Sequence, residues 1–164
     1  MPQRMKKTVI DQLDDIDQKI LTILLEDGKT PYAEIGKNLH ISAGTVHVRI
    51  KKMIDLGVII GNHIEIDHKI LGFDISAFLG IYLEKSSMYD EVSKELMDIP
   101  EVVSAHYTTG MYSIFAKLVC RDTDHLRETL SNKIQKIKGI QRTETFISLD
   151  ATIDRPVSVQ GMNL

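Results

Sequence analysis

Residues 30–57 (TPYAEIGKNLHISAGTVHVRIKKMIDLG) constrain this chain more than any other segment, because they read as two short helices joined by a tight turn. The pair Thr30-Pro31 is expected to begin the first helix, with the threonine as its cap, since proline at the first helical position needs no backbone donor. His40-Ile41 makes the turn, Ser42 caps the second helix and Gly57 ends it. This order of elements is typical of a helix-turn-helix, a motif that reads DNA.

An amphipathic helix is expected just before this segment, which would complete a three-helix domain over residues 11–57. Its first turn contains Asp14, Asp15 and Asp17, and carboxylates favour the positive end of the helix dipole. Its apolar stripe consists of Leu13, Ile16, Ile20, Ile23 and Leu24. The last helix of the domain is expected to pack on the other two through Val46, Ile50 and Met53.

The opposite side of this last helix is polar and basic. Residues 29–52 contain five basic side chains and one acidic one, although the net charge of the whole chain is −3. Phosphates respond to such local concentrations of charge. Thr45 and Val48 suit thymine methyl groups, and Arg49 suits guanine or phosphate. The alternative is a basic, solvated face of a module that binds another protein. The predicted DNA-contacting residues are Thr30, Tyr32, Ser42, Gly44, Thr45, His47, Val48, Arg49, Lys51 and Lys52.

The composition indicates an ordinary globular protein, with 43% hydrophobic and 26% charged residues. No apolar run approaches the roughly 20 residues of a membrane span, and residues 1–12 lack the apolar stretch of a signal peptide. We therefore expect a cytoplasmic protein with no membrane partner. The single cysteine, Cys120, lies in an apolar strand-like run and is expected to be a small core residue rather than a nucleophile.

Residues 58–72 are expected to form an extended strand that links the helices to the rest of the chain. The segment begins with a β-prone apolar tripeptide, and Ile64 and Ile66 alternate with polar residues. A strand beside the helices would make the first domain a winged type of helix-turn-helix. His63 and His68 lie nearby, but no cysteine or carboxylate cluster accompanies them, so no metal site is predicted.

Residues 73–150 contain an internal repeat with a period of 38 positions. One helical apolar stripe consists of Met88, Val92, Leu96 and Ile99, and its counterpart consists of Leu126, Leu130, Ile134 and Ile137. Strands are expected before and after each helix, over about 74–84 and 112–121 and from Val102 and Ile140. The order strand, helix, strand, strand, helix, strand predicts a ferredoxin-like α+β domain, with a four-stranded antiparallel sheet and both helices on one face.

The second face of this sheet is expected to be bare. Alternate residues of the strand over 74–83 would face the helices, whereas Phe78 and Tyr82 would point the other way, where Phe115 or Phe146 would join them. A monomer with such an apolar patch would be unusual. Back-to-back pairing of two sheets would cover it and give a symmetric dimer with two recognition helices.

Residues 107–113 (YTTGMYS) lie between the second and third strands and combine a glycine turn with hydroxyl side chains. Gly110 allows a positive φ, which would expose neighbouring backbone N–H groups. A small zwitterion needs donors for its carboxylate and acceptors for its ammonium group, and this segment offers both. The alternative is an ordinary hairpin with polar decoration, and the spacing alone does not decide between them.

At this point the chain resembles the Lrp/AsnC (leucine-responsive regulatory protein) family of transcription regulators, over about residues 13–149. The resemblance rests on LDDIDQKILTILLEDGKTPYAEIGKNLHISAGTVHVRIKKMIDLGVI, LGFDISAFLGIYL, HYTTGMYSIFAKLVC and NKIQKIKGIQRTETFISL. Within the family the chain is most similar to the asparagine-responsive AsnC branch, through TTGMYSIF, NKIQ and IQRTET. His106 stands where an aromatic residue is expected, and Met111 where a polar one is expected.

The resemblance implies a regulatory domain that binds amino acids, and dimers that assemble further, commonly into octamers. It places the effector between dimers, near the hairpin after the second strand and facing the fourth strand. Gln135 would offer a donor and an acceptor to a side-chain amide, although an exposed helix glutamine is the alternative. The implied effector-binding residues are Tyr107, Thr108, Thr109, Gly110, Tyr112, Ser113, Gln135, Thr143 and Thr145.

The sequence therefore predicts a sequence-specific regulator that binds double-stranded DNA and responds to a small amino acid, with asparagine as the first candidate. No cofactor is expected. The alternative is an architectural DNA-binding protein that needs no effector. An enzyme is not expected, because a strand carboxylate at the surface explains Glu144 as well as an acid site would, and His106 and His125 have no partners that the sequence can place. Residues 151–164 show no clear period and are expected to be a poorly ordered tail or a short extension.

Overall fold

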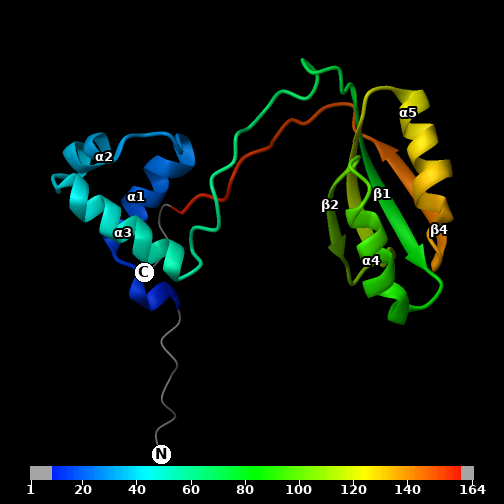
Figure 1. The fold of residues 1–164 in the computed structure, drawn as a ribbon, viewed down its shortest axis with the longest axis horizontal. Helices are drawn as coiled ribbons and strands as arrows, with labels where there is room; N and C mark the ends of the chain where they lie inside the picture. The colour runs from blue at the N-terminus through cyan, green and yellow to red at the C-terminus, as the bar shows by residue number, and fades with distance from the viewer. Residues whose placement is uncertain (1–8, 160–164) are drawn as a thin grey trace, which may run out of the picture. The chain divides into compact units, whose positions relative to one another are not determined.

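The computed structural model describes residues 9–159, and these form two compact units (Figure 1). Of the described residues, the helical unit contains 9–64 and 154–159, and the sheet unit contains Glu65–Ile153. Within this part of the chain, every helix is too short or too polar to cross a bilayer.

The helical unit contains a 3-10 turn, η1 (Val9–Gln12), and three α-helices: α1 (Asp15–Glu26), α2 (Tyr32–Leu39) and α3 (Ala43–Asp55). The predicted helical spacing is confirmed, because each helix contributes its expected apolar face to one core. The fully or almost fully buried members of this core are Ile20, Ile35, Val46, Ile50 and Met53.

Local hydrogen bonds begin two of these helices. Asp14 Oδ1 accepts from the backbone N–H groups of Ile16 and Asp17, at 3.0 and 2.9 Å, and the Asp17 side chain accepts from the Asp14 N–H, which completes a capping box. Ser42 caps α3 as predicted. The prediction that Thr30 caps α2 is wrong. Pro31 holds the cap position, and the Thr30 hydroxyl instead donates to the Asp27 carbonyl at 2.8 Å.

The turn between α2 and α3 depends on two unusual backbone positions. His40 adopts the left-handed conformation, with φ of 56°, and so reverses the chain as predicted for this turn. Gly36 is buried, and a Cβ atom there would lie 2.6 Å from the Ile41 carbonyl oxygen. The absence of a side chain at this position therefore lets the turn pack closely on α2.

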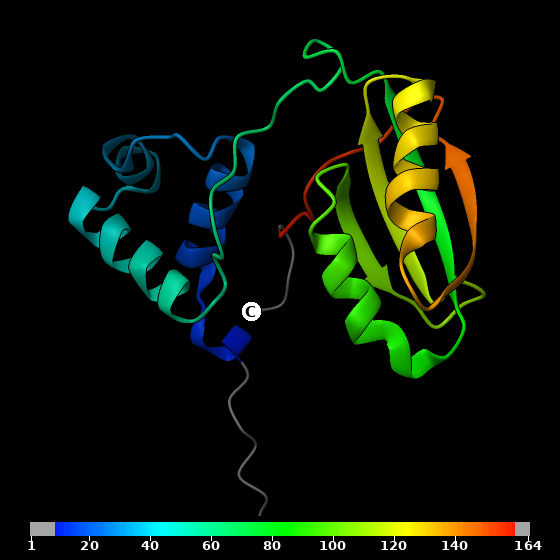
Figure 2. The same cartoon turned by 45° about the vertical axis from the view of Figure 1, so that its right-hand side comes forward.

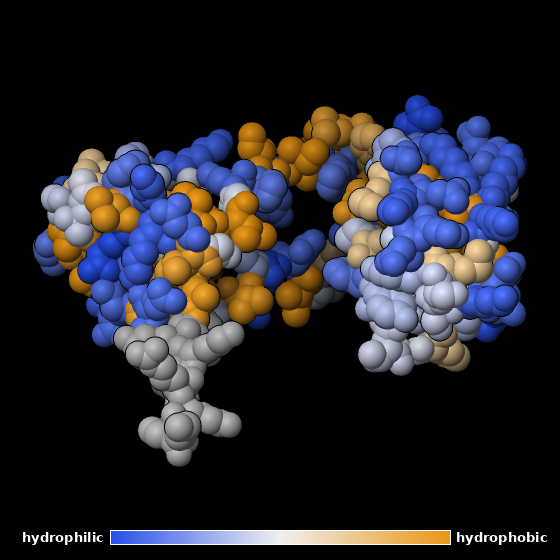
Figure 3. Space-filling model, turned by 60° about the horizontal axis from the view of Figure 1, so that its bottom comes forward, coloured by the Kyte–Doolittle hydropathy of each residue, from blue (hydrophilic) through white to orange (hydrophobic). Residues whose placement is uncertain are grey.

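The connecting segments differ from expectation. Residues 58–72 form no strand, so the described part of the helical unit has no wing; instead, Asn62 Nδ2 donates to the Gly28 carbonyl at 3.1 Å. Residues 154–159 group with the helical unit, and the Val159 carbonyl accepts from Gln18 Nε2. The rest of the expected tail lies outside the described residues. Several apolar side chains are exposed along these segments, among them Ile60, Ile64, Ile70 and Ile153. Figure 3 colours hydrophobic residues orange.

The sheet unit has four antiparallel strands in the order β2-β3-β1-β4, as predicted for a ferredoxin-like fold. The strands are β1 (Ile75–Leu83), β2 (Val102–Tyr107), β3 (Ile114–Cys120) and β4 (Ile140–Ile147). After β1 come a 3-10 turn, η2 (Ser86–Met88), and α4 (Tyr89–Met97), and α5 (Thr123–Glu128) follows β3. Figure 2 shows both α-helices on one face of the sheet.

The helix-facing side of the sheet forms the core of this unit, and Ala77, Leu79 and Ile81 of β1 are fully buried there. Cys120 is buried in the same core, as predicted, and burial raises the pKa of its thiol. The second repeat is less regular than expected. After α5 the chain continues as a π-helical turn, η3 (Thr129–Lys133), and a 3-10 turn, η4 (Ile134–Lys136).

Candidate functional site

The outer face of α3 presents most of the residues predicted to contact DNA. Gly44, Thr45, His47 and Lys51 are exposed, and Val48 is 66% exposed. A hollow of about 740 Å³ lies on this side and is lined by Asp14, Ser42, Gly44, Thr45, Val48, Arg49 and Lys52. The structure therefore brings together seven residues from α3, its cap and the start of α1.

Ser42 holds the first turn of α3 in place. Its Oγ accepts from the Thr45 N–H at 3.0 Å and lies 2.8 Å from Thr45 Oγ1. Because the cap satisfies one of the free backbone donors of the helix, the exposed first turn keeps its geometry without a partner molecule. Gly44 adds no side chain over this turn, so a ligand could approach the backbone there.

The two cations on this face that were expected to be free for DNA are not free. Arg49 Nη1 lies 2.8 Å from both carboxylate oxygens of Asp14 and 2.8 Å from Asp17 Oδ1. Lys52 Nζ lies 2.9 Å from Asp17 Oδ2 and also donates to the Gln12 carbonyl. Asp17 is fully buried, so this ion-pair cluster fixes α3 against the start of α1.

The same cluster shifts two pKa values. Burial raises the pKa of Asp14, but the hydrogen bond from Arg49 and those from the backbone more than offset this, and the net pKa is lowered. The hydrogen bonds to Asp14 and Asp17 raise the pKa of Arg49. Asp14 is therefore a carboxylate at all ordinary pH values and neutralises part of the charge of Arg49.

Two further residues expected to contact DNA are engaged elsewhere in the helical unit. The Thr30 hydroxyl is bonded to Asp27, as described above. The Tyr32 ring lies 6.0 Å from the His47 ring and lines an apolar hollow of about 450 Å³ with residues of α1, α3 and 58–62. Neither residue lines the hollow on the α3 face.

The predicted effector-binding loop, residues 108–113, is held by its own hydrogen bonds. The Thr108 N–H donates to the Ser113 carbonyl at 3.1 Å, and its hydroxyl donates to the Tyr112 carbonyl. The Ser113 N–H donates to the Ile81 carbonyl at 2.9 Å, which ties the loop to β1. Gly110 is exposed but is not among the glycines with positive φ, so that part of the prediction is wrong.

Tyr112 leaves the loop and lies on the open face of the sheet. Its hydroxyl donates to Glu144 Oε2 at 2.8 Å, and the Tyr82 hydroxyl donates to Glu144 Oε1 at 3.2 Å. The hydrogen bond to Glu144 raises the pKa of Tyr112 and lowers that of Glu144. The ring of Tyr112 covers Gly80, where a Cβ atom would lie 2.4 Å from it.

Thr143 and Thr145 lie on the other face of the sheet. They pair with Ile81 and Leu79, whose side chains are buried against the helices, and residues paired across antiparallel strands share a face. Within one chain, the predicted effector set is therefore divided, with Tyr112 on one side of the sheet and these threonines on the other. Tyr107 packs against Tyr89, with ring centroids 4.3 Å apart, and Gln135 is exposed in η4.

The open face carries the aromatic layer that was predicted. The rings of Phe78 and Phe115 stack with their centroids 5.7 Å apart, and the rings of Tyr112 and Phe146 are 6.2 Å apart. The role of Glu144 as the acceptor for two tyrosines was missed. The alternation along 142–146 places this residue on the open face, but the sequence does not show which hydroxyl groups meet it.

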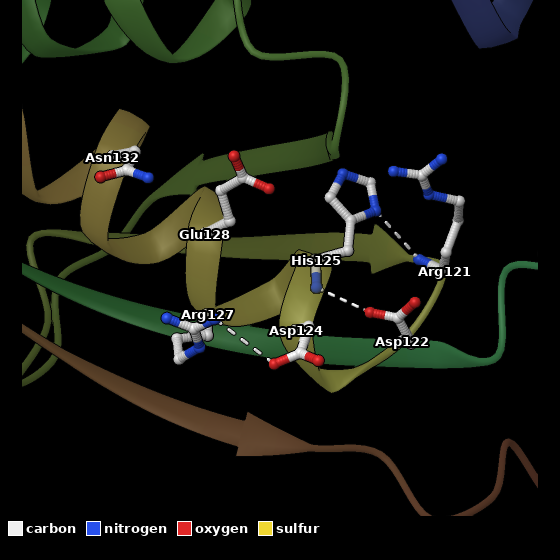
Figure 4. Close-up of a pocket in the computed structure, with 7 residues that line it drawn as sticks. All are labelled: Arg121, Asp122, Asp124, His125, Arg127, Glu128 and Asn132. Atoms are coloured by element: carbon white, nitrogen blue, oxygen red, sulfur yellow. Dashed lines mark hydrogen bonds and ion pairs between the residues drawn. The ribbon is translucent and has the colours of Figure 1, made fainter.

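A second group that the sequence missed joins β2 to the helix that follows β3. Glu101 Oε1 lies 2.9 Å from His125 Nε2 and 2.6 Å from Lys133 Nζ. His125 Nδ1 accepts from the Arg121 N–H, as Figure 4 shows, so Nε2 carries the ring proton and donates to Glu101. The missing partner of His125 is therefore Glu101, 24 positions earlier. His125 also lines a cavity of about 410 Å³ with Arg121, Asp122, Asp124, Arg127, Glu128 and Asn132.

The pKa of Glu101 is well below its ordinary value. Burial raises this pKa, but the hydrogen bonds from Lys133, from the backbone and from His125 reverse the effect and lower it to about 2. The carboxylate thus links the beginning of β2 to α5 and η3 in its ionised form.

Comparison with known proteins supports both halves of the chain. The AsnC-type helix-turn-helix domain matches residues 13–54, and the Lrp/AsnC ligand binding domain matches residues 76–158. Regulatory protein AsnC of Haemophilus influenzae is 46% identical over 145 residues, which cover 88% of this chain and 97% of that protein. The AsnC regulatory protein of Escherichia coli K12 is 43% identical over 145 residues, with coverage of 88% and 95%.

Solved structures agree with this fold. The structure of E. coli AsnC superposes with a TM-score of 0.84 at 42% identity and covers 89% of this chain and 98% of that one. A transcriptional regulator of Neisseria meningitidis, solved as a complex with L-Met, shares the fold with a TM-score of 0.83 at 19% identity, with coverage of 87% and 94%. The chain belongs to the Lrp/AsnC family of transcription regulators, in which it joins a helix-turn-helix DNA-binding domain to a ligand-binding domain.

Proposed function

We propose that this regulator binds its operator through the outer face of α3 and that a small amino acid, with asparagine as the first candidate, controls this binding through the sheet unit. The proposal of operator binding rests on the exposed face of α3 from Gly44 to Lys51. This face begins at a helix terminus that Ser42 caps. Thr45 and Val48 offer methyl groups to thymine, and Lys51 offers charge to phosphate. The protein acts in the cytoplasm and needs no catalytic step.

The amino-acid part rests on the ligand-binding domain and on relatives. The resemblance to the asparagine-responsive branch makes asparagine the first effector to test, and the Neisseria regulator, solved with L-Met, supports free amino acids as the ligand class. The proposed contacts are those of the 107–113 loop together with Gln135, Thr143 and Thr145. Because one chain divides these residues between the two faces of its sheet, a complete pocket requires a second chain.

Assembly follows from the open face of the sheet. The aromatic layer of Phe78, Phe115, Tyr112 and Phe146 leaves Phe146 46% exposed in the single chain. Burial of such a layer against its copy would stabilise a symmetric dimer at roughly 25 cal/mol per Å² of apolar surface. Further association of dimers, as far as an octamer, would place an effector between them and link its binding to the spacing of the DNA-binding units.

The first test is a thermal-shift screen of the full chain against each of the natural amino acids. Asparagine is expected to raise the melting temperature, because a ligand that binds only the folded state stabilises it by about 2.7 kcal/mol at a hundredfold excess over its Kd. Binding of DNA selected from a random pool is then measured with and without that amino acid. A regulator that binds DNA but gains no stability from any amino acid would instead be an architectural DNA-binding protein.

The second test separates the two sites. Lys51→Ala should weaken DNA binding and reduce the dependence of log K on log salt by about one, since one phosphate contact is lost. Amino-acid binding and thermal stability should stay unchanged, because this lysine is exposed. Gln135→Ala should do the reverse. Arg49→Ala is less suitable, because it breaks the cluster with Asp14 and Asp17. Equal losses of both activities in either variant would contradict this assignment.

A further inference from the structure

The hollow on the α3 face contains one feature that does not suit a DNA-binding surface. Of the seven residues that line it, Asp14 alone carries a negative charge. Its side chain is 53% exposed, so the charge faces solvent rather than the protein core. A carboxylate at the place where a phosphate would approach repels that phosphate.

Asp14 does two separate things, and only one of them needs its charge. As the cap of α1 it accepts hydrogen bonds from the N–H groups of Ile16 and Asp17, which any side-chain oxygen acceptor could do. As a carboxylate it also holds Arg49 Nη1, with both of its oxygens 2.8 Å away. In this second role the Asp14 carboxylate occupies the same guanidinium donors that a DNA phosphate would bind, because arginine binds carboxylates and phosphates through the same planar group.

The neighbouring acid differs in this respect. Asp17 also binds Arg49, but it is fully buried and is bonded to Lys52 as well, so it belongs to the packing between α1 and α3. Arg49 would therefore stay in place if its bond to Asp14 were lost. Its side chain is 23% exposed on the α3 face, so the guanidinium group remains within reach of a ligand there.

We propose that Asp14 limits the affinity of this protein for DNA by occupying Arg49 in place of a DNA phosphate. The carboxylate acts as an internal competitor, and binding of DNA requires the arginine to exchange one anion for another. This inference rests on the proposed function of the α3 face. It makes Asp14 a determinant of affinity that does not read any base, since it acts only through charge.

The test compares Asp14→Asn with Asp15→Asn. Asparagine caps helices as well as aspartate does, so the first variant removes the charge and keeps the acceptor. Asp15 is exposed in the same turn but does not line the hollow, so the second variant changes the net charge of the protein equally. Affinity is measured for the full chain with a random-sequence duplex and with a duplex selected from a random pool by the wild-type protein, over a range of salt concentrations.

Asp14→Asn is expected to bind both duplexes about fivefold more tightly at low salt, with a salt dependence steeper by about 0.9, as for one additional phosphate contact. Asp15→Asn should show a markedly smaller gain. Asp14→Ser, which also caps helices without charge, repeats the test if circular dichroism shows that the asparagine variant is misfolded. Equal affinities and salt dependences for the neutral Asp14 variant and Asp15→Asn would overturn the inference and leave DNA binding intact. If the wild-type protein selected no duplex from the pool and did not bind the random-sequence duplex, the proposed function itself would fail.

Discussion

Glu101→Gln is expected to lower the free energy of unfolding of the sheet unit by about 3 kcal/mol near neutral pH. The pKa of this carboxyl group falls from an ordinary 4.5 to about 2 in the folded protein. Its Oε1 is held by both His125 and Lys133, whereas Oε2 is buried with no hydrogen-bond partner among the described residues. A neutral amide keeps the shape but loses the interaction with the Lys133 ammonium group.

The stabilisation by Glu101 should depend on pH. Because the folded pKa is depressed, the contribution of Glu101 is complete above about pH 4.5 and is lost as the pH falls toward 2. The wild-type protein should therefore lose stability over this range, and the glutamine variant should lose about 3 kcal/mol less. At the acid end, the two proteins should be nearly equally stable.

Urea unfolding followed by tyrosine fluorescence provides the measurement, because four of the five tyrosines lie in the sheet unit. Glu128→Gln is the control, since it removes the same charge from an exposed position in the cavity that His125 lines. It should change stability by less than about 0.5 kcal/mol. If the two variants behaved alike at neutral pH, the bonds to His125 and Lys133 would not contribute to stability.

Glu101 also shows where the sequence stops being informative. Helices and strands follow from local spacing, so the faces of α1 and α3, the alternation of β1 and the strand order were all predictable. The bond between Glu101 and His125 joins residues 24 positions apart, and nothing in the spacing selects one carboxylate among many. The irregular turns after α5 were missed for a related reason, because an apolar period of four suits α and π turns alike.

The DNA-contacting face shows the same limit at a functional site. The helical period correctly placed Thr45 and Val48 on the outside of α3 and Lys51 at the margin of that side, and all three are exposed. It placed Arg49 there too, but the sequence could not show that Asp14 and Asp17 would hold the guanidinium group. In the sheet unit, a resemblance grouped Tyr112 with Thr143. The strand register assigns Thr143 to the helix-facing side, whereas the hydrogen bond to Glu144 holds Tyr112 on the open face. Patterns give the face of an element, and pairing with distant partners decides what that face can bind.

Gly36→Ala is expected to destabilise the helical unit by about 2 kcal/mol, although alanine is the better helix former by about 1 kcal/mol. The new methyl group would lie 2.6 Å from the Ile41 carbonyl oxygen and 3.3 Å from Ala43 N. These are backbone atoms of a turn that His40 already holds at φ of 56°, so they cannot move aside as a flexible side chain could.

Gly44→Ala is the matched control, because the same methyl group would lie 3.7 Å from Ser42 Oγ, an ordinary contact. This variant should be as stable as the wild type or more stable by up to about 1 kcal/mol. Amide hydrogen exchange at Ile20, Ile35 and Val46 measures the stability of the helical unit without interference from the sheet unit.

Displacement of the turn would also tilt α3 relative to α2, so Gly36→Ala should weaken DNA binding even at temperatures where the protein is folded. Unchanged hydrogen exchange in this variant would show that the turn tolerates a side chain at position 36. Unchanged DNA affinity would show that the close approach of α2 to α3 does not set the position of the recognition helix.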